Sequence, residues 1–301
     1  MGYYNLKIRQ GDPVGLNAAM TSSNTGKPPD INLRDWNFPA GTLRVLQLTD
    51  THLYANPVGS LLGINTLDSF ERVIRHFRDY HWPLDVLLAT GDLVHDASPE
   101  GYRNLGRILS GFRVPVFCLP GNHDAPPVMR EHLRNTGVYT DTVIDHGPWR
   151  FVMLDSVIPG EEGGRLAPDQ LKQLEEALAS TDRHTLVCMH HQPVDVGSLW
   201  IDTMAIENPG PLFEIIDRHS NVRGILWGHV HQTFEAKHGD IRLMASPSTC
   251  VQFAPRTDDF QVDEEPPGFR LLALLPDGSI RSEVVRTQEM PHGLELASSG
   301  Y

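Results

Sequence analysis

Most of the sequence alternates short apolar runs with longer segments whose apolar residues recur at helical spacing. The first pair is Leu43–Leu48, typical of a buried strand, and Thr66–Tyr80, typical of an amphipathic helix. Later members of the series are predicted at Val86–Ala89, Pro99–Leu109, Pro115–Leu119, Pro126–Arg134, Pro168–Ser180, Thr185–Met189, Pro211–His219 and Gly224–Trp227. Such alternation is typical of βαβ units, so the sequence predicts an α/β fold.

Other strands are predicted to run back against a neighbour. These pairs are Val143–His146 with Phe151–Leu154, Phe234–Lys237 with Ile241–Met244, and Phe269–Leu274 with Ser279–Val285. The acidic, proline-containing stretch from Asp258 to Pro267 is expected to be a long loop. Parallel and antiparallel strands together predict mixed sheets.

The two ends of the chain lack this pattern. Residues 1–42 contain four prolines and no apolar periodicity, which indicates a flexible N-terminal leader. We expect one domain over residues 43–290 and a C-terminal tail over residues 291–301.

Composition restricts the class of protein and its partners. The formal net charge of −13 and the absence of a Lys/Arg run argue against nucleic acid as a partner. No apolar run approaches the roughly 20 residues that cross a bilayer, and no secretory signal is recognisable, so we expect no membrane partner and a cytoplasmic location. The three cysteines suit reduced, buried thiols. The chain is expected to be a monomer or a homodimer.

Five short polar motifs each follow a predicted strand. They are Asp50-Thr51-His52, Gly91-Asp92, Gly121-Asn122-His123-Asp124, His190-His191 and Gly228-His229-Val230-His231. Loops at the carboxyl ends of strands converge in α/β sheets, so these motifs are expected to form one site. Carboxylates, a carboxamide and imidazoles suit Fe, Mn, Zn or Co, and their number implies two cations.

Each motif has an ordinary structural explanation when taken alone. Asp50 and Asp92 are also typical of caps and turns, the glycines of tight turns, and a lone histidine of a hydrogen-bonded or exposed side chain. The tetrapeptide Gly-Asn-His-Asp, however, is expected by chance in about one chain in a thousand of this length. All five motifs in order therefore favour a metal site.

The motifs follow the order D-x-H, G-D, G-N-H-D/E, H, G-H-x-H, and the chain thereby resembles the calcineurin-like metallophosphoesterases. Within that family it is similar to the class III cyclic nucleotide phosphodiesterases, which include the bacterial 3′,5′-cAMP phosphodiesterase, over about residues 43–286. The narrower similarity rests on residues 46–53, 61–66 and 247–253. The resemblance implies a four-layer αββα sandwich of two mixed β-sheets flanked by helices.

The resemblance also implies residue roles and a reaction. One metal ion would be held by Asp50, His52, Asp92 and His231, and the other by Asp92, Asn122, His190 and His229. Asp92 would bridge the two ions, and a hydroxide between them would attack phosphorus, converting 3′,5′-cAMP to 5′-AMP. His123 would be the catalytic acid. The substrate-binding residues would be His52, Asp92, Asn122, His123, His190, His229 and His231.

Several alternatives stay open at this point. The chain could act on another phosphodiester, such as a glycerophosphodiester or a nucleoside diphosphate derivative, or be a non-catalytic scaffold of the same fold. His123 could make only a supporting hydrogen bond, and His191 is expected to face solvent rather than to orient His190. Gln252 and Phe253 are candidates for contact with the base, although Phe253 could equally belong to the core.

Two departures argue against neighbouring families. The Asp-Arg-Gly of the serine/threonine phosphatases is missing beyond Asp92, and His95 stands where purple acid phosphatases have an iron-binding tyrosine. The other histidines match no motif and are expected at the surface: His76, His81, His132, His146, His184, His219, His238 and His292.

Overall fold

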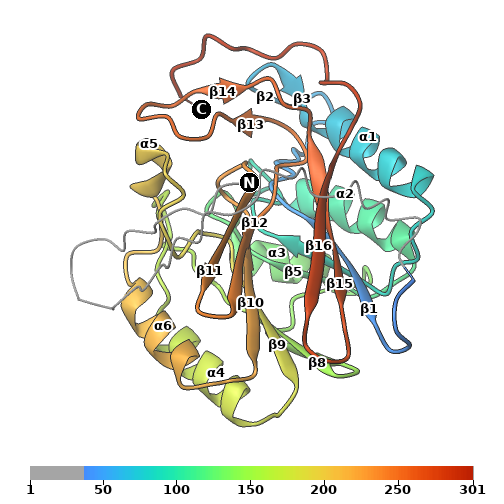
Figure 1. Ribbon diagram of the computed structural model, residues 1–301. Coiled ribbons are helices and arrows are strands. Elements are labelled where there is room, and N and C mark those ends of the chain that lie inside the picture. Colours follow the sequence, from blue (N-terminus) through green and yellow to red (C-terminus); the bar gives the residue numbers. More distant parts are fainter. Residues whose placement is uncertain (1–36, 301) are drawn as a thin grey trace, which may run out of the picture.

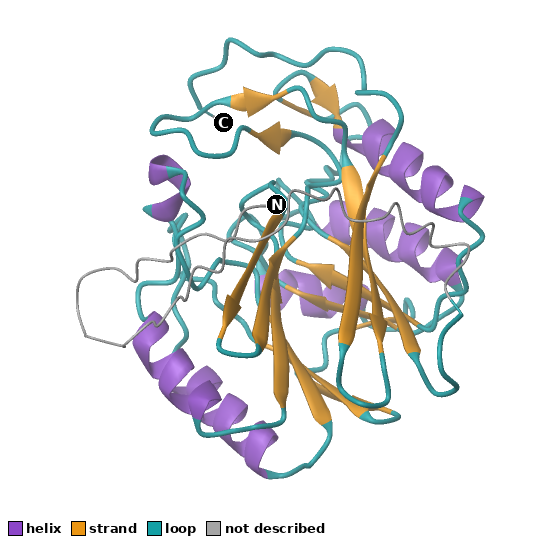
Figure 2. Ribbon diagram, in the orientation of Figure 1, coloured by secondary structure: helices purple, strands orange, loops and turns teal. Residues whose placement is uncertain are grey.

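Two six-stranded sheets lie face to face, with helices on both outer sides, in the computed structural model, which describes residues 37–300 (Figures 1 and 2). The α/β fold and its four-layer arrangement are therefore confirmed. The predicted leader lies mostly outside the described residues, and the domain boundaries stay a prediction. No helix among residues 37–300 is both long and apolar enough to cross a membrane.

The first sheet contains the βαβ units predicted near the start of the chain. Its strands, in spatial order, are β16 (Ile280–Arg286), β15 (Gly268–Leu274), β1 (Leu43–Leu48), β4 (Val86–Thr90), β5 (Val116–Leu119) and β6 (Val138–Tyr139). From β1 to β6 neighbouring strands are parallel, whereas β15 and β16 are antiparallel additions. The covering helices are α1 (Thr66–Asp79), α2 (Pro99–Leu109), which continues into the short 3₁₀ helix η2 (Ser110–Phe112), and α3 (Pro126–Leu133).

The second sheet has the same mixed character. Its strands, in spatial order, are β11 (Phe234–His238), β12 (Ile241–Ala245), β10 (Val222–Trp227), β9 (His184–Cys188), β8 (Trp149–Met153) and β7 (Val143–His146). The four strands from β12 to β8 are parallel, and β11 and β7 pair antiparallel at the two edges. The outer face is covered by α4 (Pro168–Ala179) and α6 (Pro209–Asp217).

Three apolar clusters hold these layers together. One joins the first sheet to α1, α2 and α3, and a second joins the other sheet to α4 and α6. The third lies between the sheets, where Val45 and Leu88 of one sheet share a cluster with Phe151 and Leu226 of the other. Strands buried on both faces explain why the predicted strands read as apolar runs rather than as alternating patterns.

Local signals set where several helices begin. The Asn65 side chain accepts a hydrogen bond from the Asp68 amide at 2.8 Å, and Ser98 does the same for the Gly101 amide at 3.1 Å. Four helices, α2, α3, α4 and α6, carry proline in their first turn, where no amide hydrogen bond is lost.

The short elements are the ones that the sequence does not predict. They are the hairpins β2 (Ser60–Leu61) with β3 (Ile64–Asn65) and β13 (Gln252–Phe253) with β14 (Val262–Asp263), the edge strand β6, and the helix α5 (Leu199–Asp202). Strand β14 lies inside the stretch expected to be a loop, so that expectation is wrong for Val262 and Asp263. The two hairpins share an apolar cluster above one end of the sheets (Figure 1).

Candidate metal centre

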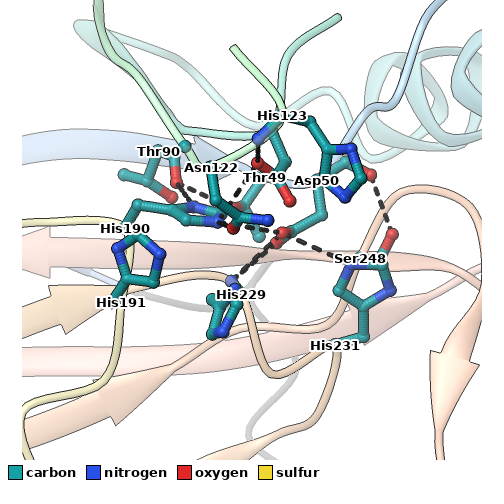
Figure 3. Close-up of polar contacts among 12 residues, drawn as sticks. Thr49, Asp50, Thr90, Asn122, His123, His190, His191, His229, His231 and Ser248 are labelled. Carbon is teal, nitrogen blue, oxygen red and sulfur yellow. Dashed lines mark hydrogen bonds and ion pairs between the residues drawn. The ribbon is translucent and has the colours of Figure 1, made fainter. Parts of the chain in front are cut away.

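All five motifs lie at the carboxyl ends of central strands and meet at one edge of the sandwich. Three of them follow β1, β4 and β5 of the first sheet, and two follow β9 and β10 of the second. Contacts across the sandwich join them: the His229 amide donates to both carboxylate oxygens of Asp50, at 3.1 and 3.2 Å. Figure 3 shows Asp50, Asn122, His190, His229 and His231 close together at this edge.

The backbone at these motifs is strained. Asp50, His52, Asp92, His229 and His231 all have positive φ, between 43° and 63°. Such a conformation costs about 1–3 kcal/mol for a residue that is not glycine, and it clusters at functional sites. The neighbouring glycines also do more than form turns. A Cβ atom on Gly91 would overlap the His190 ring, and one on Gly121 would overlap the Asp92 carboxylate.

The first group of donors contains Asp50, His52 and His231, all fully buried. The Nε2 atoms of His52 and His231 lie 3.2 Å apart, and His231 Nε2 lies 3.4 Å from Asp50 Oδ1. His52 Nε2 is also 3.6 Å from Asp92 Oδ2. The structure therefore brings together all four residues that were expected to hold the first ion.

The second group forms around His190. Its Nε2 atom lies 3.3 Å from Asp92 Oδ1 and 3.2 Å from Asn122 Oδ1. The rings of His190 and His229 are neighbours, with centroids 5.1 Å apart. Asp92 thus presents one oxygen to each group, which is the placement that a bridging ligand requires.

Polar atoms at the centre lack hydrogen-bond partners within the described part of the chain. They are Asp92 Oδ2 and both ring nitrogens of His229, all buried. An unsatisfied buried polar atom costs about 1–3 kcal/mol, so such atoms are rare unless a ligand completes them. The donor set therefore fits metal ions.

Hydrogen bonds behind the rings orient the donors. His190 Nδ1 donates to the Thr90 carbonyl at 2.9 Å, and His231 Nδ1 donates to the Val251 carbonyl at 2.9 Å. Because a carbonyl oxygen can only accept, each Nδ1 carries the proton and each Nε2 presents a lone pair to the centre. Metal-ligating histidines in proteins are held in this way.

The electrostatics of the centre also suit a cation. Burial lowers the pKa of His52 and of His229 well below the usual value, which keeps both rings neutral. Burial raises the pKa of Asp92, but His190 outweighs it and leaves that pKa well below the ordinary value. Burial lowers the pKa of His190, but Asp92 raises it to about 9. The attraction between His190 Nε2 and Asp92 Oδ1 thus marks a point at which positive charge is stabilised, as a bound cation requires.

Comparison with known proteins identifies the family. The family model for calcineurin-like phosphoesterases matches residues 43–233, a range that contains all five motifs. The chain belongs to this family. Its members use a centre of two metal ions, and the histidine and aspartate groups described above supply the donors for one.

Curated relatives in this family are similar along most of their length. The 3′,5′-cyclic adenosine monophosphate phosphodiesterase CpdA of Vibrio vulnificus is 40% identical over 262 residues, covering 86% of this chain and 96% of the relative. The protein of the same name from Escherichia coli K12 is 38% identical over 261 residues, covering 86% and 95%. A 3′,5′-cyclic-nucleotide phosphodiesterase of Nostoc is 36% identical over 255 residues, covering 84% and 95%.

Solved structures support the fold. A dimetal phosphatase from Danio rerio has a TM-score of 0.58 at 14% identity, covering 82% of this chain and 99% of its own. GAP50, the anchor in the inner membrane complex of Plasmodium, also has a TM-score of 0.58, at 11% identity, covering 86% and 90%. At these identities the likeness shows the calcineurin-like fold alone.

The last residue of the Gly-Asn-His-Asp motif braces the centre from behind. The Asp124 carboxylate accepts hydrogen bonds from the amides of Leu93, Val94 and Gly121, and from the Tyr102 hydroxyl at 2.9 Å. Burial raises its pKa to about 6. Asp124 therefore ties the loop after β4 to the loop after β5, a role that sequence reasoning did not assign.

His123 and His95 lie side by side next to the first group of donors. Their rings stack with centroids 4.4 Å apart and 21° between the planes, and the His123 ring lies 5.0 Å from that of His52. The His123 amide also donates to Asp92 Oδ1 at 3.0 Å. His95 was missed as a site residue, although its position three residues after Asp92 was a usable signal.

His191 is buried, so the expectation that it faces solvent is wrong. Its Nδ1 atom lies 2.8 Å from Ser156 Oγ and its Nε2 atom 3.2 Å from the Glu162 carbonyl. Its ring centroid is 4.6 Å from that of His229, so it packs behind a metal-ligand candidate. The eight histidines expected at the surface are all exposed or partly exposed.

The two candidates for base contact are also buried. Phe253 stacks on His231, with centroids 4.3 Å apart and 9° between the planes, and Gln252 Nε2 donates to the Ser248 carbonyl at 2.9 Å. Their burial favours the alternative in which Phe253 belongs to the core, and base contact by either residue stays untested. Phe253 belongs to the core and supports the His231 ring from behind.

Proposed function

We propose that this protein hydrolyses 3′,5′-cyclic AMP to 5′-AMP at a two-metal centre. One combined observation carries the proposal. The side chains that we expect to bind metal, six of them buried and Asn122 partly exposed, lie close together in a chain that is 38–40% identical to cAMP phosphodiesterases over most of its length. The acidic chain, with its charge of −13, suits a small substrate held at a local cationic centre better than a polyanion.

The donors divide into two sets that share Asp92. We assign Asp50, His52, Asp92 and His231 to one ion. Asp92, Asn122, His190 and His229 are assigned to the other. The ions, which we expect to be Fe, Mn, Zn or Co, would lower the pKa of a water molecule and stabilise the charge that develops on the phosphate oxygens. Six of the seven donor side chains are fully buried or nearly so, which keeps other water away from the centre.

His123 is the proposed general acid. Formation of 5′-AMP breaks the bond between phosphorus and the 3′ oxygen, adds a hydroxyl from water to phosphorus, and leaves a proton on the 3′ oxygen. His123 is partly exposed and lies beside His52, so its ring can reach a substrate phosphate bound between the two donor groups. A side chain placed in this way can supply the proton. The proposed substrate-binding residues are this histidine and six of the metal ligands: His52, Asp92, Asn122, His123, His190, His229 and His231.

Hydrolysis of a substrate panel tests the proposal. The purified protein, with its metal content measured, is incubated with 3′,5′-cAMP, 3′,5′-cGMP, a glycerophosphodiester and a nucleoside diphosphate derivative, and products are separated by chromatography. We expect 5′-AMP from cAMP to be the most rapidly formed product. If a linear diester is hydrolysed faster than cAMP, the protein is a phosphodiesterase with a different substrate. If no diester is hydrolysed, the protein is a non-catalytic scaffold of the same fold.

Location and assembly are proposed on separate grounds. All three cysteines are buried and form no disulfide, as is typical of proteins in a reducing compartment, and this supports our proposal of a cytoplasmic location. A monomer or homodimer, with neither nucleic acid nor membrane as a partner, remains our prediction.

A further inference from the structure

Backbone pairing between two of the motif loops places His95 behind His52. The Leu53 amide donates to the Leu93 carbonyl at 3.1 Å, and the His95 amide donates to the Leu53 carbonyl at 2.8 Å. The next residue strengthens this pairing, since Asp96 Oδ2 accepts from the Ala55 amide at 3.0 Å. Backbone hydrogen bonds between the loops that carry Asp50, His52 and Asp92 therefore fix the position of His95.

The contact between the two rings fixes which nitrogen carries the proton. His52 Nδ1 and His95 Nδ1 lie 3.1 Å apart, so one donates and the other accepts. His52 Nε2 faces Asp92 and His231 in the centre. If that Nε2 binds a metal ion, the proton of His52 is on Nδ1, and His95 must accept through its own Nδ1 lone pair. In His190 and His231 a main-chain carbonyl accepts this proton.

The faces of the His95 ring make further contacts. One is the stack with His123 described above, and another is with Tyr54, whose ring centroid is 4.9 Å away at 39°. The Tyr54 hydroxyl in turn donates to the Ser60 carbonyl at 3.0 Å. The ring that accepts from His52 therefore also restricts the orientation of His123.

We propose that His95 is a positioning residue that acts on the centre through two separable contacts. Its Nδ1 atom holds His52 in the tautomer and orientation that present Nε2 to a metal ion. Its ring face holds His123 in the orientation needed to protonate the leaving oxygen. The inference rests on the proposed function, because it assumes that His52 binds metal and that His123 is the acid.

Three substitutions separate the two contacts. His95→Asn keeps an acceptor in the place of Nδ1 but removes the ring. His95→Phe keeps a flat ring to stack on His123 but removes the acceptor. His95→Ala removes both contacts, and His292→Ala, at an exposed histidine that belongs to none of the motifs, is the matched control. Circular dichroism and thermal unfolding of the metal-free proteins establish that each variant folds.

Metal affinity, measured by competition with a chromogenic chelator, tests the first contact without any activity measurement. Partners of metal-ligating histidines typically contribute 10–100-fold to metal affinity. We expect a loss of about this size in His95→Ala and His95→Phe, and affinity within about threefold of the parent in His95→Asn and His292→Ala. Equal affinity in all variants would overturn the first contact. A parent protein that binds no metal would instead overturn the proposed function.

The ratio of kcat on cAMP to kcat on a bis-nitrophenyl phosphodiester tests the second contact, because only the poor leaving group of cAMP needs the acid. The ratio should fall at least about tenfold in His95→Ala and His95→Asn and stay near the parent value in His95→Phe. An unchanged ratio in His95→Asn would overturn the second contact.

One measurement on the parent protein needs no variant. Nitrogen-15 chemical shifts of the zinc-loaded protein report the protonation of each imidazole nitrogen. We expect His52 to carry its proton on Nδ1 and His95 to have an unprotonated Nδ1. A proton on His95 Nδ1 would contradict the proposal.

Discussion

Asp92 is the residue on which both groups of donors depend. One of its carboxylate oxygens lies near His190 and the other near His52. Its backbone has a positive φ, and only a glycine at position 121 leaves room for its carboxylate. The sequence motif alone indicates Asp92 as a ligand, but it does not show the positive-φ backbone conformation that orients the carboxylate. His95 and His191 were missed or misjudged for a related reason. Their importance comes from contacts between loops, and no local pattern records such contacts.

Replacing Asp92 should cause the largest loss of any single donor. Asp92→Ala removes a ligand from both ions. Residues that only hydrogen-bond to a metal ligand already contribute about 10–100-fold to metal affinity or activity, so the loss of a shared ligand should exceed that range. We therefore expect kcat/KM on cAMP to fall more than about 100-fold and metal content to fall with it. Asp92→Asn keeps the size of the side chain and serves as the comparison. Activity within about tenfold of the parent would rule out a shared ligand at this position.

His123→Ala should behave differently from the loss of a ligand. General acid catalysis contributes about 10²–10⁴-fold, so kcat on cAMP should fall by that range while metal content stays near two ions per chain. A nitrophenyl diester has a good leaving group that needs no proton, so kcat on this substrate should fall much less. If metal content falls with the rate, His123 supports the ligands; if both substrates lose equally, it only positions phosphate.

At the scale of elements, long apolar patterns were predictable and two-residue elements were not. Strand β1 and helix α2 begin and end where their apolar residues and caps indicate. The hairpin of β13 and β14 has two residues in each strand, too few to show a period, and its apolar cluster forms only with segments far along the chain. The interaction of Arg270 with Glu235 also joins segments that are far apart in the sequence, so the sequence does not predict it.

Arg270 links the two sheets through an ion pair with the partly exposed Glu235. It lies on β15 of the first sheet, is fully buried, and donates to Glu235 on β11 at 2.6 Å and to the Ala245 carbonyl on β12 at 2.7 Å. Glu235→Gln leaves this guanidinium without its counter-charge, and because Glu235 is 31% exposed, the cost should be near that of one hydrogen bond to a charged group, about 1.5–3 kcal/mol. We expect a loss of that order in the free energy of unfolding at pH 7, measured by urea denaturation.

The same pair predicts a pH dependence. Burial raises the pKa of Glu235, but Arg270 lowers it by more, so the net pKa lies below its ordinary value. A carboxyl with a lowered pKa contributes stability that is present above its unfolded-state pKa, about 4.3, and is lost as pH falls through the folded-state value. The difference between the parent and Glu235→Gln should therefore shrink between pH 5 and pH 3. Glu100→Gln, at an exposed ion pair with Arg103, is the control, and it should leave the free energy of unfolding nearly unchanged at every pH because solvent screens this pair. A difference that stays constant with pH would contradict the assignment.

At the scale of the whole molecule, the centre exists only where the two sheets meet. Strands β1, β4 and β5 bring their donors from one sheet and β9 and β10 from the other, so neither half of the chain holds a complete set. The sequence could place every motif after a strand because each strand is locally apolar. It could not show which strands would be neighbours across the sandwich, nor the contacts behind each ring.

Metal ions should therefore stabilise the entire fold. A ligand that binds only the folded state adds about 2.7 kcal/mol at 100 times its Kd. We expect Tm, measured by calorimetry, to rise by several degrees when metal-free protein is reloaded, and to fall again with a chelator. The Asp92→Ala protein should show a much smaller change. Equal shifts in both proteins would mean that the ions bind elsewhere.

Stepwise reconstitution tests the central claim most directly. Metal-free protein is titrated with Mn²⁺ at concentrations well above the Kd, and the formation of 5′-AMP from 3′,5′-cAMP is followed at each ratio of metal to protein. The two-metal centre predicts no hydrolysis without metal and a rate that stops rising at two equivalents. Full activity in the metal-free protein, a plateau at one equivalent, or no 5′-AMP at any ratio would contradict the account.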